Sequence, residues 1–198
     1  MSKKIRREAI YIAPDISGRL DDNSTPIVYD ERNRLYLNPA DVMDKIKIYE
    51  RQVVDWFLNP ASKLIKYRNK NNGFVVLMIC ISYLEGVEQY RMGQSSNSNS
   101  RVFFKSAMQR MYPNRFQDFD LNNFYDEARC GLFHDGMTRQ RIIINNSFKE
   151  SIEFDTFDIK ISPSKFLADI KNDFNNFLNE LRTNQLMRND FDRMYSVT

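Results

Sequence analysis

The sequence is poor in the residues that bind soft metals and form disulfides. It contains two cysteines, Cys80 and Cys130, and a single histidine, His134, among 198 residues. Two separated cysteines cannot build a disulfide framework, which favours a reducing compartment, and we expect a cytoplasmic protein. A zinc site normally takes four nitrogen or sulfur ligands, so we expect neither a metal site nor another cofactor.

Glycine and proline are also scarce, and neither sign of charge is in large excess. The 6 Gly and 6 Pro exclude collagen-like and proline-rich classes, and the net charge of +3 is smaller than a dedicated double-stranded DNA binder usually carries. The basic N-terminus, Met1–Arg7, leads into no apolar segment of the kind found in signal peptides. The most apolar stretch, Phe74–Leu84, is shorter than the about 20 residues that a membrane helix needs. We therefore expect no membrane association.

The pattern of apolar residues predicts mainly helices. Hydrophobic residues make up 42% of the chain and aromatic residues 13%, which is enough for a packed core. Helical spacing predicts a helix over residues 38–59 and a shorter one that follows it to about residue 67. Further helices are predicted over 73–92, 101–111 and 118–134, and a last one begins at 162. Strands are predicted over 142–144 and 152–161. The expected fold class is mainly α, a helical bundle with a small antiparallel β ribbon over 140–162.

The same pattern predicts a single domain over residues 38–182. Residues 1–37 are predicted to form an irregular lead-in, with one short hairpin in which residues 27–29 and 35–37 flank a polar turn. Residues 183–198 are predicted to form a polar C-terminal tail that frays.

One segment carries residues suited to phosphodiester chemistry. Arg129 and His134 stand five residues apart near the end of the predicted helix 118–134. Histidine can accept and donate protons near neutral pH, and the planar guanidinium of arginine matches phosphate oxygens. Both residues also have a structural interpretation, His134 as a helix-end histidine and Arg129 as the partner of a neighbouring surface acid.

Helix geometry adds a constraint on this pair. In an ideal α-helix, five residues correspond to a rotation of about 140°, so Arg129 and His134 would not be neighbours on one narrow stripe. Phe133 would lie on the outward face beside them. A solvated face seldom carries phenylalanine at that position, so the pattern favours a homodimer interface, with Arg129 and His134 lining a groove between the protomers.

The segment resembles the HEPN superfamily, helical bundles whose signature is an arginine, four to six residues, and a histidine. The resemblance in helix order covers about residues 40–182. It implies a metal-independent ribonuclease that works as a homodimer, with His134 as general acid or base and Arg129 holding the phosphate and stabilising the transition state. The implied products are a cyclic phosphate and a 5′-hydroxyl end. It also implies a toxin or host-defence effector, with RNA as substrate and a cognate inhibitor protein as partner.

Further residues are candidates for supporting roles. Glu85, on the otherwise apolar helix 73–92, could orient Arg129 or His134 across the bundle, and Asp126 lies on the same predicted helix as the pair. A basic cluster could follow an RNA backbone, and it contains Lys63, Lys66, Arg68 and Lys70. HEPN proteins often carry a polar residue directly after the arginine, where this chain has Cys130. The alternative function is therefore a non-catalytic HEPN-like binding module for RNA, a nucleotide or a protein.

Overall fold

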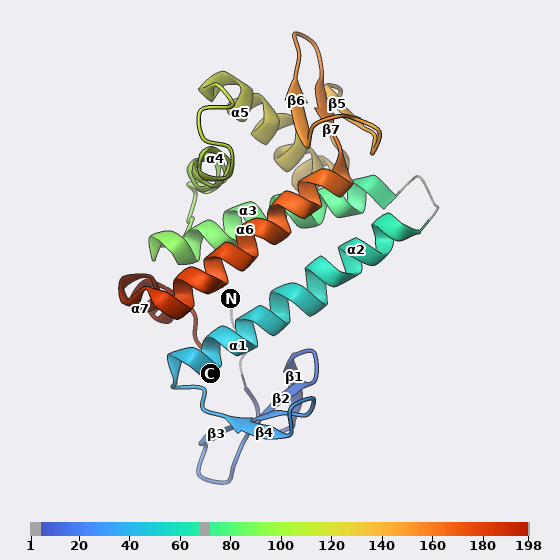
Figure 1. The fold of residues 1–198 in the computed structure, drawn as a ribbon. Coiled ribbons are helices and arrows are strands. Elements are labelled where there is room, and N and C mark those ends of the chain that lie inside the picture. The colour runs from blue at the N-terminus through green and yellow to red at the C-terminus, as the bar shows by residue number, and fades with distance from the viewer. Residues whose placement is uncertain (1–4, 68–71, 198) are drawn as a thin grey trace. The chain divides into compact units, whose positions relative to one another are not determined.

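The computed structural model describes residues 5–67 and 72–197, and its helices and two small β-sheets are drawn in Figure 1. The chain is 57% helical and combines a four-stranded antiparallel sheet with a three-stranded mixed sheet. The fold is therefore an α/β mix, and the expected mainly α bundle with one antiparallel ribbon is wrong. Backbone contacts divide the chain into unit 1, Met1–Pro60 with Asn176–Thr198, and unit 2, Ala61–Asn175.

Unit 1 contains the antiparallel sheet, in the strand order β1-β2-β3-β4. Its strands are β1 (Ile10–Ala13), β2 (Ile16–Leu20), β3 (Pro26–Asp30) and β4 (Leu35–Leu37). Alternate residues face the core, and Ile12, Ile16 and Val28 are almost fully buried. The predicted hairpin corresponds to β3 and β4, but the rest of the lead-in is not irregular. Strands β1 and β2 are short, and Gly18 interrupts the pattern of β2, so periodicity does not reveal them.

The first helical segment of unit 1 widens before a proline. It consists of α1 (Val42–Val53), the π-type turn η1 (Val54–Leu58) and α2 (Asn59–Lys66), whose last residues belong to unit 2. Helix α1 begins later than the expected Asn38, because the Asp41 carboxylate accepts hydrogen bonds from the backbone N–H groups of Met43 and Asp44. Pro60 lacks an N–H donor and its ring crowds the preceding turn, which explains a widened turn at this place.

The C-terminal segment is ordered, contrary to the expected polar tail. Helix α6 (Pro163–Thr183) is followed by α7 (Gln185–Met194). The rings of Phe191 and Tyr195 lie 5.3 and 5.5 Å from the ring of Tyr49 on α1. All three side chains are buried. Two aromatic residues one turn apart therefore fix a segment whose overall composition is polar.

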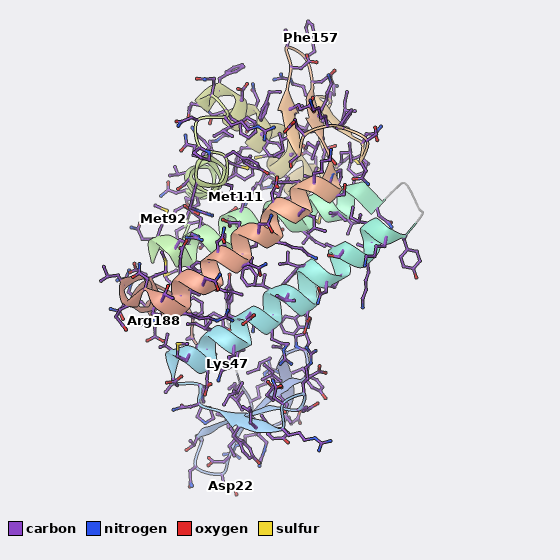
Figure 2. The ribbon with its side chains drawn as sticks, in the orientation of Figure 1. Asp22, Lys47, Met92, Met111, Phe157 and Arg188 are labelled. Atoms are coloured by element: carbon purple, nitrogen blue, oxygen red, sulfur yellow. The ribbon has the colours of Figure 1, made fainter. Side chains whose placement is uncertain are left out.

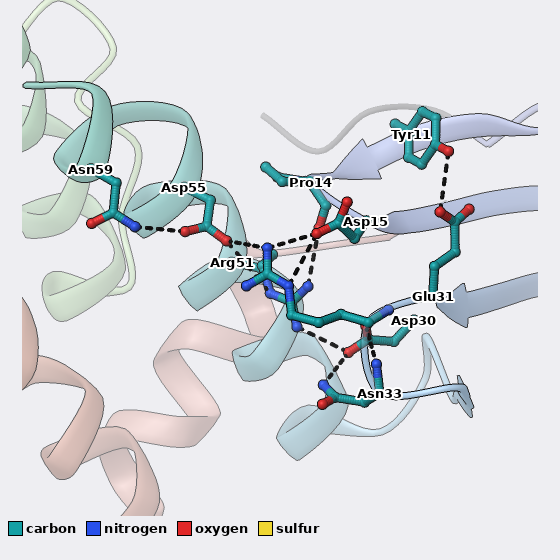
Figure 3. Close-up of polar contacts among 10 residues, drawn as sticks. Tyr11, Pro14, Asp15, Asp30, Glu31, Asn33, Arg51, Asp55 and Asn59 are labelled. Atoms are coloured by element: carbon teal, nitrogen blue, oxygen red, sulfur yellow. Dashed lines mark hydrogen bonds and ion pairs between the residues drawn. The ribbon is translucent and has the colours of Figure 1, made fainter. Parts of the chain in front are cut away.

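A charged cluster in unit 1 lines an open cavity of about 320 Å³. Figure 3 shows the polar contacts of several residues of this cluster. Asp30 is only 3% exposed. Its carboxylate accepts hydrogen bonds from the Asn33 side chain at 2.7 Å and from Arg51 at 3.1 Å. Burial on its own would raise the pKa of Asp30, but the bonds from Asn33 and the charge of Arg51 outweigh it and hold that pKa below its ordinary value.

This lowered pKa makes Asp30 a source of acid sensitivity. A carboxylate with a lowered pKa stabilises the folded state above its unfolded pKa, and this contribution is lost as the pH falls through the folded value. We expect Asp30→Asn to lower the free energy of unfolding by about 1–3 kcal/mol at pH 7. The penalty should shrink at pH 3, as measured by urea unfolding at both values. The exposed Asp22→Asn is the control, and an equal penalty for Asp30→Asn at both pH values would contradict the prediction.

Unit 2 is organised around α3 (Gly73–Met92), which has the bounds predicted from the sequence. The other helices of the unit are α4 (Ser100–Met111), α5 (Asp118–Phe124), η3 (Tyr125–Asp135) and the part of α6 up to Asn175. Helix α3 is long and apolar enough to cross a membrane by length and composition, although Phe74–Leu84 alone was too short for this. Half of its most apolar window is buried, which fits the core helix of a soluble protein.

The expected antiparallel ribbon is a mixed sheet in the order β5-β7-β6. Its strands are β5 (Ile142–Ile144), β6 (Ile152–Phe154) and β7 (Ile159–Ile161). Strands β6 and β7 form an antiparallel hairpin, and β5 pairs with β7 in parallel. The predicted strand 152–161 is thus two strands, because Asp155 and Asp158 form a backbone-bonded turn between them. Figure 2 shows Phe157 at the tip of this hairpin, where it is 77% exposed.

A buried ionic network connects three helices inside unit 2. Arg110 on α4 forms ion pairs with Glu88 on α3 and with Asp173 on α6. The two carboxylates are only 5% and 8% exposed. Ser106 donates to Glu88 at 2.7 Å, and Tyr83 donates to Asp173 at 2.7 Å. One guanidinium thus compensates two buried acids, whose remaining lone pairs are used by hydroxyl groups.

Candidate functional site

Arg129 and His134 lie on η3, a helix of the π type with 11 residues. In a π-helix each N–H bonds to the carbonyl five residues earlier, so side chains five apart are neighbours. Arg129 Nη1 lies 3.3 Å from His134 Nε2. Since arginine only donates, this is a hydrogen bond when the imidazole is neutral with its proton on Nδ1. The expected separation of about 140° applies to an α-helix and is wrong for this segment.

The chain after η3 folds back onto the helix and fixes its end. The N–H of Met137 donates to the Gly131 carbonyl at 3.2 Å, and the N–H of Arg139 donates to the Glu127 carbonyl at 2.9 Å. A Cβ atom at Gly131 would lie 2.6 Å from the carbonyl oxygen of Met137. Glycine is therefore required for this close approach, which places His134 at an exposed corner of unit 2.

Arg129 is held from several sides. Its Nη2 donates to Oε2 of Glu85 at 3.0 Å, and both side chains are about one-fifth exposed. The guanidinium carbon lies 5.5 Å from the Tyr125 ring centroid and 5.2 Å from that of Phe133. Ser96 donates to the other oxygen of Glu85 at 3.0 Å. The structure thus brings Glu85 to Arg129, where the carboxylate fixes the orientation of the guanidinium.

Asp126, the second supporting candidate, contacts a different arginine. Arg101 on α4 donates to both of its carboxylate oxygens, at 2.9 and 2.6 Å. The hydrogen bonds from Arg101 hold the pKa of Asp126 below its ordinary value. The Arg101 guanidinium also lies over the Tyr125 ring, 4.5 Å from its centroid. Asp126 is therefore connected to Arg129 only through Arg101 and the Tyr125 ring, against which both guanidinium groups lie.

The pair is thus a fixed guanidinium beside an exposed imidazole, with a carboxylate behind the guanidinium. No family model, curated protein or solved structure matches the chain. The chemistry of the site is therefore inferred from its own geometry. In the described parts of the chain, no group of three or more His, Cys, Asp or Glu side chains is placed to hold a metal ion.

The predicted RNA-binding cluster is only partly described. Lys63 and Lys66 are exposed on α2, a different element from the one that carries the pair. Arg68 and Lys70 lie outside the described residues. The contribution of this cluster to RNA binding stays a prediction. Cys130, directly after the arginine, is half-buried and free.

A hollow of about 210 Å³ lies next to Arg129, between α3 and η3. Glu85, Gly86 and Gln89 line it from α3, and Arg129 and Phe133 line it from η3. Phe133 is 45% exposed, so its ring forms an open wall of this hollow. The guanidinium of Arg129, the candidate phosphate-binding group, therefore also lines this hollow.

Sequence reasoning missed Arg101, Ser96 and Gln89. Their contacts bridge a loop and two helices, and spacing along one helix does not reveal them. The polar loop that contains Ser96 directly follows the strongly apolar helix α3, which also carries Glu85, and this is the one sequence signal that the loop packs near the candidate site. The π geometry of η3 was also missed, because apolar periodicity over 118–134 resembles that of an α-helix.

Proposed function

We propose that this protein is a metal-independent endoribonuclease in which Arg129 binds the scissile phosphate and His134 transfers a proton. The observation that carries the proposal is the 3.3 Å contact between Arg129 Nη1 and His134 Nε2. A guanidinium and an imidazole at this distance can contact one phosphodiester linkage and its ribose together.

The chemistry follows from these two groups. The substrate phosphate replaces His134 as the acceptor of the Arg129 Nη1 N–H group. The single lone pair of His134 Nε2 then accepts the proton of the ribose 2′-hydroxyl, whose oxygen attacks the phosphorus. The phosphorus–O5′ bond breaks, a proton passes to O5′, and the products are a 2′,3′-cyclic phosphate and a 5′-hydroxyl end. Arg129 stabilises the charge that develops on the phosphate oxygens. The contacts with Glu85 and His134 engage two of its N–H groups, and a guanidinium has five.

The proposal includes a homodimer. Apolar side chains are exposed near the pair, and Phe133 and Met137 are 45% and 59% exposed. A patch of this kind supports contact with a second copy, whose imidazole would supply the second proton transfer. The wider role as a cytoplasmic toxin or host-defence effector, with a cognate inhibitor protein, rests on the resemblance to the HEPN superfamily.

The test is cleavage of RNA by the purified protein in EDTA. We expect cleavage of single-stranded RNA with 2′,3′-cyclic phosphate ends, identified by mass spectrometry, and none where a 2′-deoxynucleotide replaces the nucleotide at the cut. Products with 5′-phosphate ends would contradict the mechanism. Binding of RNA, a nucleotide or a protein without turnover would support the non-catalytic module instead.

A further inference from the structure

The hollow beside Arg129 combines features of a binding pocket for a planar ring. Phe133 supplies an open aromatic wall. Ser82 and Gln89 bring a hydroxyl and an amide to its lining. The hydroxyl donates to the Met78 carbonyl, and the amide donates to the Glu85 carbonyl and accepts from the Ser96 N–H group. Each side chain keeps free acceptor capacity on its oxygen, and Gln89 keeps one amide N–H. Arg129 lies between the hollow and His134, within hydrogen-bonding distance of the imidazole. A ring bound in the hollow would therefore lie directly beside the proposed phosphate position.

Gly86 leaves this hollow open. It lies within α3, where glycine destabilises a helix by about 1 kcal/mol relative to alanine. A Cβ atom at this position would meet nothing within 4 Å beyond its own helical turn and chain neighbours. Close packing therefore does not require glycine at this position. A ligand that approaches the helix backbone is a physical reason for a missing side chain at such a place.

We propose that the hollow binds a nucleobase next to the scissile phosphate of single-stranded RNA. This inference rests on the proposed ribonuclease function, because the position of the phosphate on Arg129 fixes where the adjacent base lies. The base stacks on the part of the Phe133 ring that lines the hollow, and its edge meets the polar groups of Ser82 and Gln89. Contact with the second copy in the proposed homodimer then falls to Met137 and to the rest of the exposed Phe133 side chain. Bases of an RNA duplex are paired and stacked, so only an unpaired base can enter.

The first test fills the hollow from the helix side. The probes are short 2′-O-methyl oligoribonucleotides of A, C, G or U, which lack the attacking hydroxyl and stay intact during fluorescence-anisotropy titrations. We expect Gly86→Leu to raise the Kd of the tightest of them by about tenfold or more, since stacking of one base is worth that much. Gly86→Ala adds one methyl group and is the matched control, with a Kd close to the wild-type value. Thermal unfolding should show both variants at least as stable as the wild type.

The second test removes the base from the RNA. An abasic nucleotide is placed at each position of the tightest oligonucleotide in turn. We expect one position to weaken wild-type binding by about tenfold, and the same change to have little effect on Gly86→Leu. This coupling identifies the base that occupies the hollow.

The possible results distinguish failure of the base-binding proposal from failure of the ribonuclease proposal. Three results would overturn the assignment of the hollow to a nucleobase. They are an unchanged Kd of Gly86→Leu, the same Kd for all the abasic oligonucleotides, and no binding of RNA by the wild type. Loss of self-association in Gly86→Leu by light scattering, with RNA binding intact, would assign the hollow to a second copy of the chain and would also overturn it. Base-dependent binding without cleavage of ordinary RNA would keep the hollow and remove the ribonuclease.

Discussion

His134→Ala is expected to lower kcat for RNA cleavage by about 10²–10⁴-fold, the usual range for loss of a general acid or base. His134 is the single histidine of the chain, so no other imidazole can replace it. Its side chain is exposed at the end of η3, and the variant should fold as the wild type does. Initial rates on a labelled single-stranded RNA in EDTA, together with circular dichroism, measure both properties.

Arg129 is expected to act as a unit with His134. Arg129→Ala should lower kcat by about 10²–10³-fold, and Arg129→Lys should recover little, because an ammonium lacks the planar fork. The double variant should be barely slower than the slower single variant, since the two groups act on one linkage. Arg139→Ala, which removes a half-exposed arginine paired with Asp135, is the control and should cleave as the wild type does. Equal cleavage by the wild type and His134→Ala would remove the proposal.

Arg110→Met is expected to lower the free energy of unfolding by about 3–5 kcal/mol, the largest stability effect we predict. Methionine fills a similar volume but leaves Glu88 and Asp173 buried without a positive partner. Such a loss is a large part of the total stability of an ordinary protein, so the variant should unfold at a much lower urea concentration. Chemical unfolding followed by tryptophan fluorescence and circular dichroism provides the measurement.

Two further variants show whether charge is the cause. Arg110→Met combined with Glu88→Gln and Asp173→Asn removes both acids and should recover much of the stability, because amides are less costly to bury than carboxylates. Arg139→Met removes an exposed ion pair and should change the stability by at most about 1 kcal/mol. Equal effects of Arg110→Met and Arg139→Met would contradict the buried-network interpretation.

The sequence predicts the long helices well, because their apolar positions repeat over many turns. Helix α3 was expected at its observed bounds, and α4 begins only one residue before the expected Arg101. The two sheets were predicted only in part. The β3–β4 hairpin, strand β5 and the region of β6 and β7 were expected, whereas β1, β2 and the parallel pairing of β5 with β7 were not. Strands of three to five residues offer too few alternating positions, and the parallel pairing of β5 with β7 depends on contacts across the intervening hairpin.

The candidate site was predictable in its residue types and not in its geometry. Arg129 and His134 stand out because histidine is so rare in this chain, and Glu85 because it interrupts an apolar helix. The partner of Asp126 could not be predicted, because Arg101 reaches it from another helix. The distance between the Arg129 guanidinium and the His134 imidazole depends on whether the helix is of the α or the π type, and residue spacing alone does not reveal this.

The π geometry of η3 makes the site dependent on the backbone as well as on side-chain identity. If η3 took up α geometry, the imidazole of His134 would turn about 140° around the helix axis from the guanidinium of Arg129. Both side chains would remain in the chain while losing their common target. A substitution elsewhere in η3 that restores the α-helical hydrogen-bond pattern can therefore silence the site, although neither residue of the pair has changed.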